Sequence, residues 1–92
     1  PTKEKNKIYV VGAVNEPKYL IYREGLKIFD AILECGGFTK FAKESAVLIL
    51  RQQDGQDSRI KINIEDLIND GDLSQNIELA RGDYVMVQEG IF

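Results

Sequence analysis

The sequence contains no histidine and no tryptophan, and it has a single cysteine and two prolines among its 92 residues. Without histidine, neither a Ser-His-Asp triad nor a Cys-His pair can form, and imidazole is missing as a metal ligand. With Cys35 alone, an internal disulfide and a CxxC metal knuckle are both impossible. We therefore expect a protein that is not an enzyme and that uses no metal and no cofactor.

Long apolar runs and an excess of basic charge are also missing. The longest run of apolar residues and glycine, Ile8–Val14, is far shorter than the roughly 20 residues that cross a bilayer, so we expect no membrane insertion. Twelve Lys and Arg stand against fifteen Asp and Glu, a net charge of −3. Because binding to phosphates needs a basic surface, this balance argues against a nucleic-acid partner.

What the chain does have is the composition of one globular domain, with 43% hydrophobic and 29% charged residues. Residues 1–7 are polar and rich in lysine, and they lack the apolar stretch of a signal peptide. We predict a flexible linker at residues 1–7 and one folded domain at residues 8–92.

The first half of the chain predicts a hairpin followed by a helix. The β-branched run Ile8–Val14 is typical of a strand that is covered on both faces or lies in the middle of a small sheet. A turn at Asn15-Glu16-Pro17 leads to a return strand, Tyr19–Tyr22. Apolar residues then recur at helical spacing, at Leu26, Ile28, Phe29, Ile32, Leu33 and Cys35.

Both ends of this helix can be read from the sequence. Gly36-Gly37 ends it, with Gly36 suited to the left-handed position after a helix. Lys27 stands where an N-cap Ser or Thr would be favourable, and nothing in the sequence compensates for it. We expect Phe38–Ser45 to be a loop.

The second half predicts three more strands and a short helix. The expected elements are a strand at Ala46–Arg51, a turn at Asp54-Gly55, an alternating strand at Arg59–Ile64, a helix capped by Asn63 and stopped by Gly71, a loop at 72–76, and a last strand at Tyr84–Val87. This order indicates an α+β fold of the β-grasp type, a mixed sheet of about five strands with one main helix and one short helix. Another small α+β roll is the alternative.

One segment combines aromatic rings with cations. Phe38 and Phe41 alternate with Lys40 and Lys43 after the Gly-Gly pair, a pattern that could hold a sugar ring or an anionic polymer by stacking and charge. Arg51, at the far end of a strand, is a candidate to reach the same region. The competing interpretation is that both rings fold over the end of the helix and that Arg51 is a solvated strand terminus.

Other clusters in the sequence do not form binding motifs. Counted from Asp66, the acids miss the positions of a calcium-binding EF-hand loop, since Ile68 and Ile77 occupy ligand positions. The glycines match no phosphate-binding motif. Charge is divided unevenly: residues 1–46 carry +2, and residues 47–92 carry −5. If the two halves form opposite flanks, copies could meet head to tail, while a solvated and screened surface is the plainer reading.

Four pieces together resemble a known family. They are Val11-Gly12-Ala13-Val14-Asn15-Glu16-Pro17, then Asp30 to Phe38 with the sequence DAILECGGF, then Ser45-Ala46-Val47 with Arg51, and finally Leu79-Ala80-Arg81-Gly82-Asp83-Tyr84-Val85. In this order they resemble the soluble-ligand-binding β-grasp (SLBB) domain, as found in outer-membrane polysaccharide export proteins of Gram-negative bacteria. Two positions depart from the family pattern, which usually has Gly at Lys18 and Thr at Lys27.

The resemblance implies a function as well as a fold. It implies a non-catalytic periplasmic module of a channel that exports capsule or exopolysaccharide, contributing ring assembly and saccharide binding at Phe38, Lys40, Phe41, Lys43 and Arg51. The implied partners are copies of itself in a ring-shaped exporter, an inner-membrane polysaccharide co-polymerase and polysaccharide. The alternative is a β-grasp module that binds only protein, in a DNA-uptake or redox complex.

Overall fold

Strand pairing organises residues 6–90, the part of the chain that the computed structural model describes. The strands are β1 (Lys7–Gly12), β2 (Lys18–Ile21), β3 (Ala42–Gln53), β4 (Gln56–Ile62) and β5 (Tyr84–Glu89). The helices are α1 (Ile28–Glu34), α2 (Ile64–Asp70) and the short 3-10 helix η2 (Leu73–Gln75). Most of the predicted linker, residues 1–5, lies outside the described residues, and β1 begins at Lys7.

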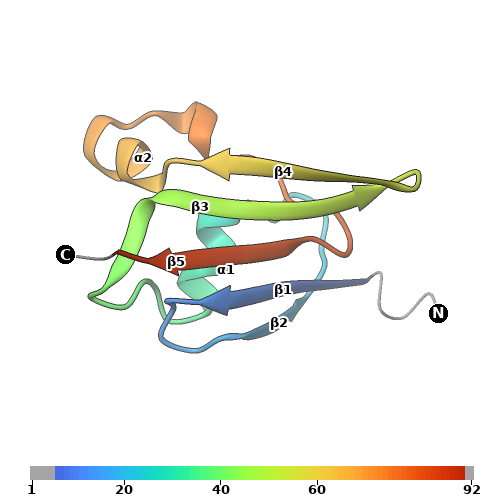
Figure 1. Ribbon diagram of the computed structural model, residues 1–92, viewed down its shortest axis with the longest axis horizontal. Helices are drawn as coiled ribbons and strands as arrows, with labels where there is room; N and C mark the ends of the chain where they lie inside the picture. The colour runs from blue at the N-terminus through green and yellow to red at the C-terminus, as the bar shows by residue number, and fades with distance from the viewer. Residues whose placement is uncertain (1–5, 91–92) are drawn as a thin grey trace.

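The five strands form one mixed sheet in the order β2-β1-β5-β3-β4. The first hairpin pairs β1 with β2 in antiparallel register, and β3 pairs in the same sense with both β4 and β5. At the centre of the sheet β1 and β5 run parallel, although they come from the two ends of the chain. This arrangement, visible in Figure 1, confirms the predicted β-grasp fold.

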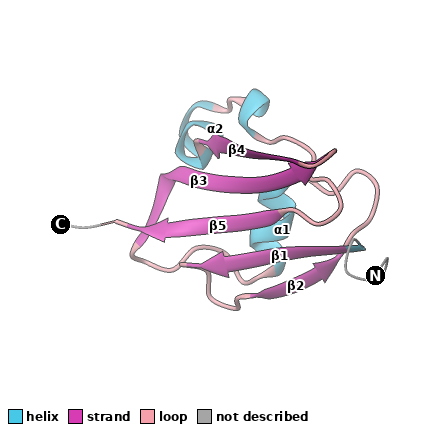
Figure 2. Ribbon diagram, turned by 45° about the vertical axis from the view of Figure 1, so that its right-hand side comes forward, coloured by secondary structure: helices cyan, strands magenta, loops and turns pink. Residues whose placement is uncertain are grey.

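Within residues 6–90, a helix covers one face of the sheet and leaves the other face open. In Figures 1 and 2, α1 crosses behind the strands, and α2 with η2 lies beside the β4 edge. From α1, Ile28, Ala31 and Ile32 are fully buried. The sheet meets them with Ile8, Val10, Leu20, Val47, Ile49, Val85 and Val87. Of the two alternatives for the first strand, a place in the middle of the sheet is confirmed, since β1 lies between β2 and β5. It is not covered on both faces, because Tyr9 is only half-buried and Val11 is exposed.

The two helices differ less than the sequence suggests. Each has seven residues, so the predicted contrast of a main and a short helix is absent in length. Leu33, expected on the buried face of α1, is exposed. In α2, Asn63 caps the helix as predicted by accepting a hydrogen bond from the Asp66 amide, and Gly71 ends it in the left-handed conformation.

The missing cap of α1 is supplied by a distant loop. Lys27 makes no side-chain cap, as expected. Instead the Phe29 amide donates to Oδ1 of Asn76 at 3.1 Å, and the Ile28 amide donates to the Ile77 carbonyl at 3.0 Å. Two of the first-turn amides that a helix leaves unpaired are therefore satisfied by residues far along the chain, a compensation that no local pattern reveals.

Several predicted boundaries shift in the second half. The segment expected as a loop up to Ser45 ends earlier, because β3 begins at Ala42, with an irregularity between Ala42 and Val47. The strand expected to reach Ile64 ends at Ile62, because Ile64 begins α2. The loop expected at residues 72–76 contains η2.

The loop between β1 and β2 is hydrogen-bonded to the C-terminal end of α1. The Asn15 side-chain amide donates to the Gly36 carbonyl at 2.7 Å, and the Glu16 amide donates to the Cys35 carbonyl at 2.8 Å. Gly36 is left-handed with φ 83°, as predicted, and an added Cβ there would lie 3.0 Å from the Cβ of Asn15. These contacts join two sequence motifs that are far apart in the chain.

The hairpin accepts Lys18 at the position where the family usually has glycine. Lys18 is the first residue of β2 and pairs with Val10. Among residues 6–90, Asp54 is the one non-glycine residue with a positive φ, so the backbone at Lys18 does not need the glycine that the family usually has there.

Gly12 leaves no room for a side chain where β1 meets β5. It has φ 96°, and an added Cβ would lie 2.1 Å from the Val87 carbonyl oxygen. The same oxygen accepts a hydrogen bond from the Ala13 amide at 2.8 Å. A side chain at Gly12 would therefore push apart the parallel β1–β5 pair at the centre of the sheet.

We expect Gly12→Ala to lower the free energy of unfolding, measured by urea denaturation, by roughly 2–4 kcal/mol. Gly25→Ala is the matched control, because Gly25 also has a positive φ but open space at its Cβ position. The control should lose only about 1–2 kcal/mol from the left-handed backbone. Equal losses in the two variants would show that the contact with Val87 is not the cause.

Candidate functional site

The uncovered face of the sheet carries a row of side chains that crosses all five strands. The strand registers place these side chains opposite one another in the order Tyr19, Tyr9, Tyr84, Leu50 and Arg59. Five strands spaced by about 4.8 Å give this row a length of roughly 19 Å. Its members come from both ends and the middle of the sequence, and only strand pairing brings them together.

The three tyrosines of the row are packed against each other. The rings of Tyr9 and Tyr84 stack with centroids 4.6 Å apart and planes at 16°. Tyr19 is tilted against Tyr9 at 6.4 Å, and the Lys7 ammonium lies 4.4 Å from the centre of the Tyr19 ring. Tyr84 keeps 47% of its surface exposed, so a large aromatic surface remains open to solvent.

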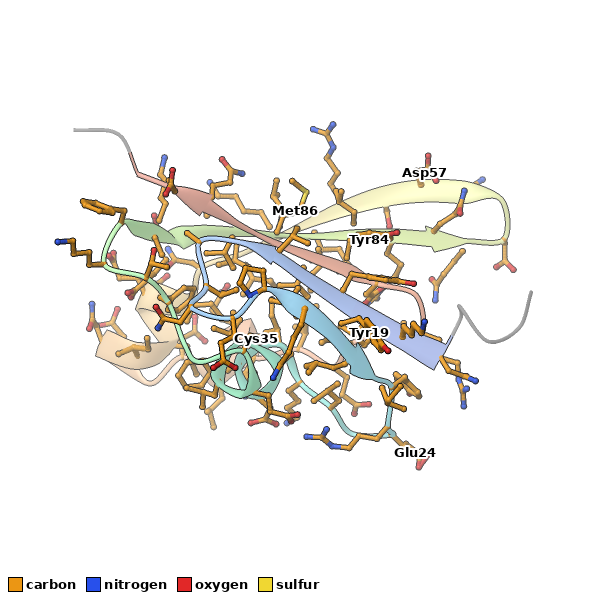
Figure 3. The ribbon with its side chains drawn as sticks, turned by 90° about the horizontal axis from the view of Figure 1, so that it is seen from below. Tyr19, Glu24, Cys35, Asp57, Tyr84 and Met86 are labelled. Atoms are coloured by element: carbon orange, nitrogen blue, oxygen red, sulfur yellow. The ribbon has the colours of Figure 1, made fainter. Side chains whose placement is uncertain are left out.

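A hollow of about 610 Å³ opens at the β3–β4 end of this row. Its lining residues are Leu50, Arg51, Gln52, Asp57, Ser58, Arg59, Gly82 and Tyr84. Figure 3 shows Tyr84, Met86 and Asp57 on the side of the sheet away from α1, whereas Cys35 lies on the side of α1. The hollow thus combines one aromatic ring and one aliphatic side chain with several hydrogen-bonding groups, the usual make-up of a small-ligand site.

Arg51 is one of the residues that line the hollow, and its side chain, on the α1 side of the sheet, is fixed by a buried acid. Its Nε donates to Oδ1 of Asp83 at 3.1 Å and its Nη2 donates to Oδ2 at 2.8 Å. The Asp83 side chain is 1% exposed and also accepts from the Ala80 amide at 2.8 Å. Hydrogen bonding to Asp83 raises the pKa of the Arg51 guanidinium above its ordinary value. This two-point ion pair holds the turn before β5 against β3.

The structure does not bring together the five site residues predicted from the sequence. Phe38, Lys40, Phe41 and Lys43 lie at the start of β3, and Arg51 lies near its other end. At about 3.3 Å per strand residue, Ala42 and Arg51 are separated by roughly 30 Å. The expected convergence of Arg51 with the loop is therefore wrong, and Arg51 alone borders the hollow.

The two phenylalanines of that loop have different environments. Phe38 is partly buried, packs against the core and forms an isolated bridge with Val14, which agrees with a ring folded over the end of the helix. Phe41 is 48% exposed, and the Lys40 ammonium lies 5.1 Å from the centre of its ring. Lys43 is exposed. The loop therefore offers one exposed ring and two cations.

Cys35 is fully buried among apolar side chains. Burial raises the pKa of its thiol, so the thiolate needed for nucleophilic or metal chemistry is disfavoured. Within residues 6–90, no three His, Cys, Asp or Glu side chains are grouped as a metal site would require. No helix of this part of the chain is long and apolar enough to cross a membrane.

Sequence reasoning missed Tyr84, Arg59, Gln52 and Asp57. A partial signal existed, since the alternation in Arg59–Ile64 placed its polar residues on one face. That signal could not show that Arg59 and Tyr84 line the same hollow, because the strands that carry them are separated by β3. Sequence patterns do not show which distant strands pair, and the site could not be predicted without that pairing.

Comparison with known proteins supports the expected family. The family model described as "SLBB domain" matches residues 6–87. No curated protein matches the chain.

We expect Asp83→Asn and Arg51→Gln each to lower the free energy of unfolding by about 2–4 kcal/mol, because each leaves its partner without its charge in a mostly buried site. Urea denaturation measures the loss. Arg23→Gln is the control, since the Arg23–Glu34 pair at 2.5 Å is largely exposed and its removal should leave stability within experimental error. An Arg51→Gln variant as stable as the parent would mean that Arg51 has no structural role.

Proposed function

Because the chain belongs to the SLBB domain family, we propose that it is a non-catalytic module of a polysaccharide exporter and that it holds saccharide in the hollow beside Tyr84. The observation that carries the proposal is the meeting of one exposed aromatic ring with three polar side chains on the face away from α1. Those side chains are Gln52, Asp57 and Arg59.

The chemistry of the hollow suits a sugar. A sugar ring has an apolar C–H face and a rim of hydroxyl groups. The exposed surface of Tyr84 offers an aromatic partner to the C–H face, and Leu50 extends the apolar floor. Gln52 and Arg59 can donate hydrogen bonds to hydroxyl or carboxylate oxygens, and Asp57 can accept them from hydroxyl groups.

The hollow is better suited to holding a polymer than to cleaving it. The row Tyr19, Tyr9 and Tyr84 leads across the sheet into the hollow, so a chain of several sugar units could lie across the strands. The residues that line the hollow include no nucleophile paired with a base, and the sequence supplies no histidine. Binding without reaction is therefore the role that these groups support.

The setting of the module follows from the family resemblance. We place it outside the cytoplasm, in the periplasm, within a protein associated with the outer membrane. Its partners would be copies of itself in a ring-shaped exporter for capsule or exopolysaccharide and an inner-membrane polysaccharide co-polymerase. The exposed ring and cations at Phe41, Lys40 and Lys43 are the competing location for saccharide, which the sequence suggested and which the test below separates from the hollow.

The test is a titration of the ¹⁵N-labelled chain with acidic and neutral oligosaccharides, followed by NMR. We expect amide shifts at Gln52, Asp57 to Arg59 and Tyr84. Tyr84→Ala should weaken binding roughly three- to tenfold through loss of the stacking surface, and Tyr84→Phe should bind nearly as the parent does.

Phe41→Ala is the matched control, because Phe41 is exposed to the same degree as Tyr84 but lies at the other end of β3. It should leave the affinity unchanged. Shifts confined to Phe38–Lys43, with loss of binding in Phe41→Ala, would move the site to that loop. No shifts with either class of saccharide would contradict saccharide binding and favour a module that binds only protein.

A further inference from the structure

The uncovered face of the sheet has a charge opposite in sign to that of the whole chain. Among the residues that pair between the five strands, four charged side chains lie on this face, namely Lys7, Asp57, Arg59 and Lys61. Three of them are cations and one is an acid, a balance of +2, whereas the 92-residue chain carries −3. Because positive charge gathered on one face of an acidic protein attracts anions to that face, an anionic ligand is favoured there.

The β4 edge of this face is a basic rim, formed by Arg59 and Lys61. The row of tyrosines passes through Leu50 and ends at Arg59. A second row runs beside it and ends at Lys61, and its other members are Val11, Met86 and Leu48. The two cations are two residues apart on one face of the strand, roughly 6.6 Å along β4. Both are exposed and neither forms an ion pair within residues 6–90, so both are available to a ligand.

Arg59 is the arginine of the hollow whose charge is open to a ligand. Arg51 also lines the hollow, but its guanidinium is bound to Asp83 on the α1 side of the sheet by two hydrogen bonds. Arg59 lies on the uncovered face, opposite Leu50. A guanidinium binds a carboxylate through two parallel hydrogen bonds, which are stronger than hydrogen bonds to neutral hydroxyl groups. A carboxylate is therefore the group that suits Arg59 best.

The other end of the tyrosine row also has a cation. The Lys7 ammonium lies 4.4 Å from the centre of the Tyr19 ring, and the stacked rings of Tyr9 and Tyr84 lie between it and Arg59. The row, roughly 19 Å long, thus has an aromatic centre and a cation at each end. A chain of sugar units that carry carboxylate groups is complementary to this order, with C–H faces for the aromatic rings and anions for the cations.

We infer that the saccharide of the uncovered face is acidic, and that carboxylate groups of its uronic acid units bind the basic rim while sugar rings lie on Tyr84 and Leu50. The inference rests on the proposed function and names the class of saccharide. Asp57, two residues before Arg59 and on the same face, repels carboxylates. The acidic group therefore binds on the Lys61 side of Arg59.

Isothermal titration calorimetry with two forms of one sugar tests the inference. The probes are tetragalacturonic acid and its full methyl ester, which keeps the sugar rings and removes the carboxylate charge. We expect the acid to bind roughly tenfold more tightly than the ester at low ionic strength. Added sodium chloride should weaken binding of the acid and leave binding of the ester nearly unchanged, because salt screens exposed charges.

Single substitutions place the preference on the basic rim. Arg59→Gln and Lys61→Gln should each weaken binding of the acid roughly two- to fivefold and change the affinity for the ester by less than about twofold. Lys27→Gln is the matched control, because it removes the same charge from an exposed position before α1, and it should change neither affinity. Asp57→Asn should strengthen binding of the acid about twofold, a gain that a damaged fold cannot produce.

The outcomes separate this inference from the proposed function. Equal affinities for the acid and the ester, or equal losses for both probes in Arg59→Gln, would overturn the preference for acidic saccharide and leave saccharide binding itself in place. Binding of neither probe would overturn the proposed function and this inference together.

Discussion

The structure depends on one constraint: a five-stranded sheet has two faces, and this chain provides a helix for only one of them. α1 buries Ile28, Ala31 and Ile32 against the inner face, and α2 lies beside an edge. The outer face must therefore be stable in contact with water while it keeps the β-branched and aromatic residues that favour strands. Stacked tyrosines and flanking cations meet that need, and they also give the face the properties of a binding surface.

The residues that make the family recognisable serve the fold rather than the ligand. Gly12 allows β1 to lie close to Val87 in the central parallel pair, and Gly36 allows the hairpin loop to pack on the end of α1. Asp83 holds Arg51 and the turn before β5. Because these positions specify the scaffold, the surface side chains around Tyr84 can differ without loss of the fold. In the proposed site, ligand choice then belongs to Gln52, Asp57 and Arg59, which lie outside the four family-like pieces, whereas Tyr84 lies within the last of them.

The sequence predicted the fold well because its signals are local. The hairpin, the Asp54-Gly55 turn, the Asn63 cap and the left-handed Gly36 each follow from a few neighbouring residues, and all four are confirmed. The site was predicted poorly because it depends on strand pairing between distant segments. Arg51 was assigned to the Phe38–Lys43 loop although it pairs with Asp83 at the other end of β3, and the Asn76 cap of α1 was invisible for the same reason.

The central claim is that ligand binds on the uncovered face, at the hollow beside Tyr84. Hydroxyl-radical footprinting of the chain with and without an acidic oligosaccharide, read by mass spectrometry, tests it most directly. The account predicts that saccharide protects Tyr84 from oxidation and leaves Phe41, which is equally exposed at the other end of β3, fully reactive. Protection of Phe41 with an unprotected Tyr84 would contradict it.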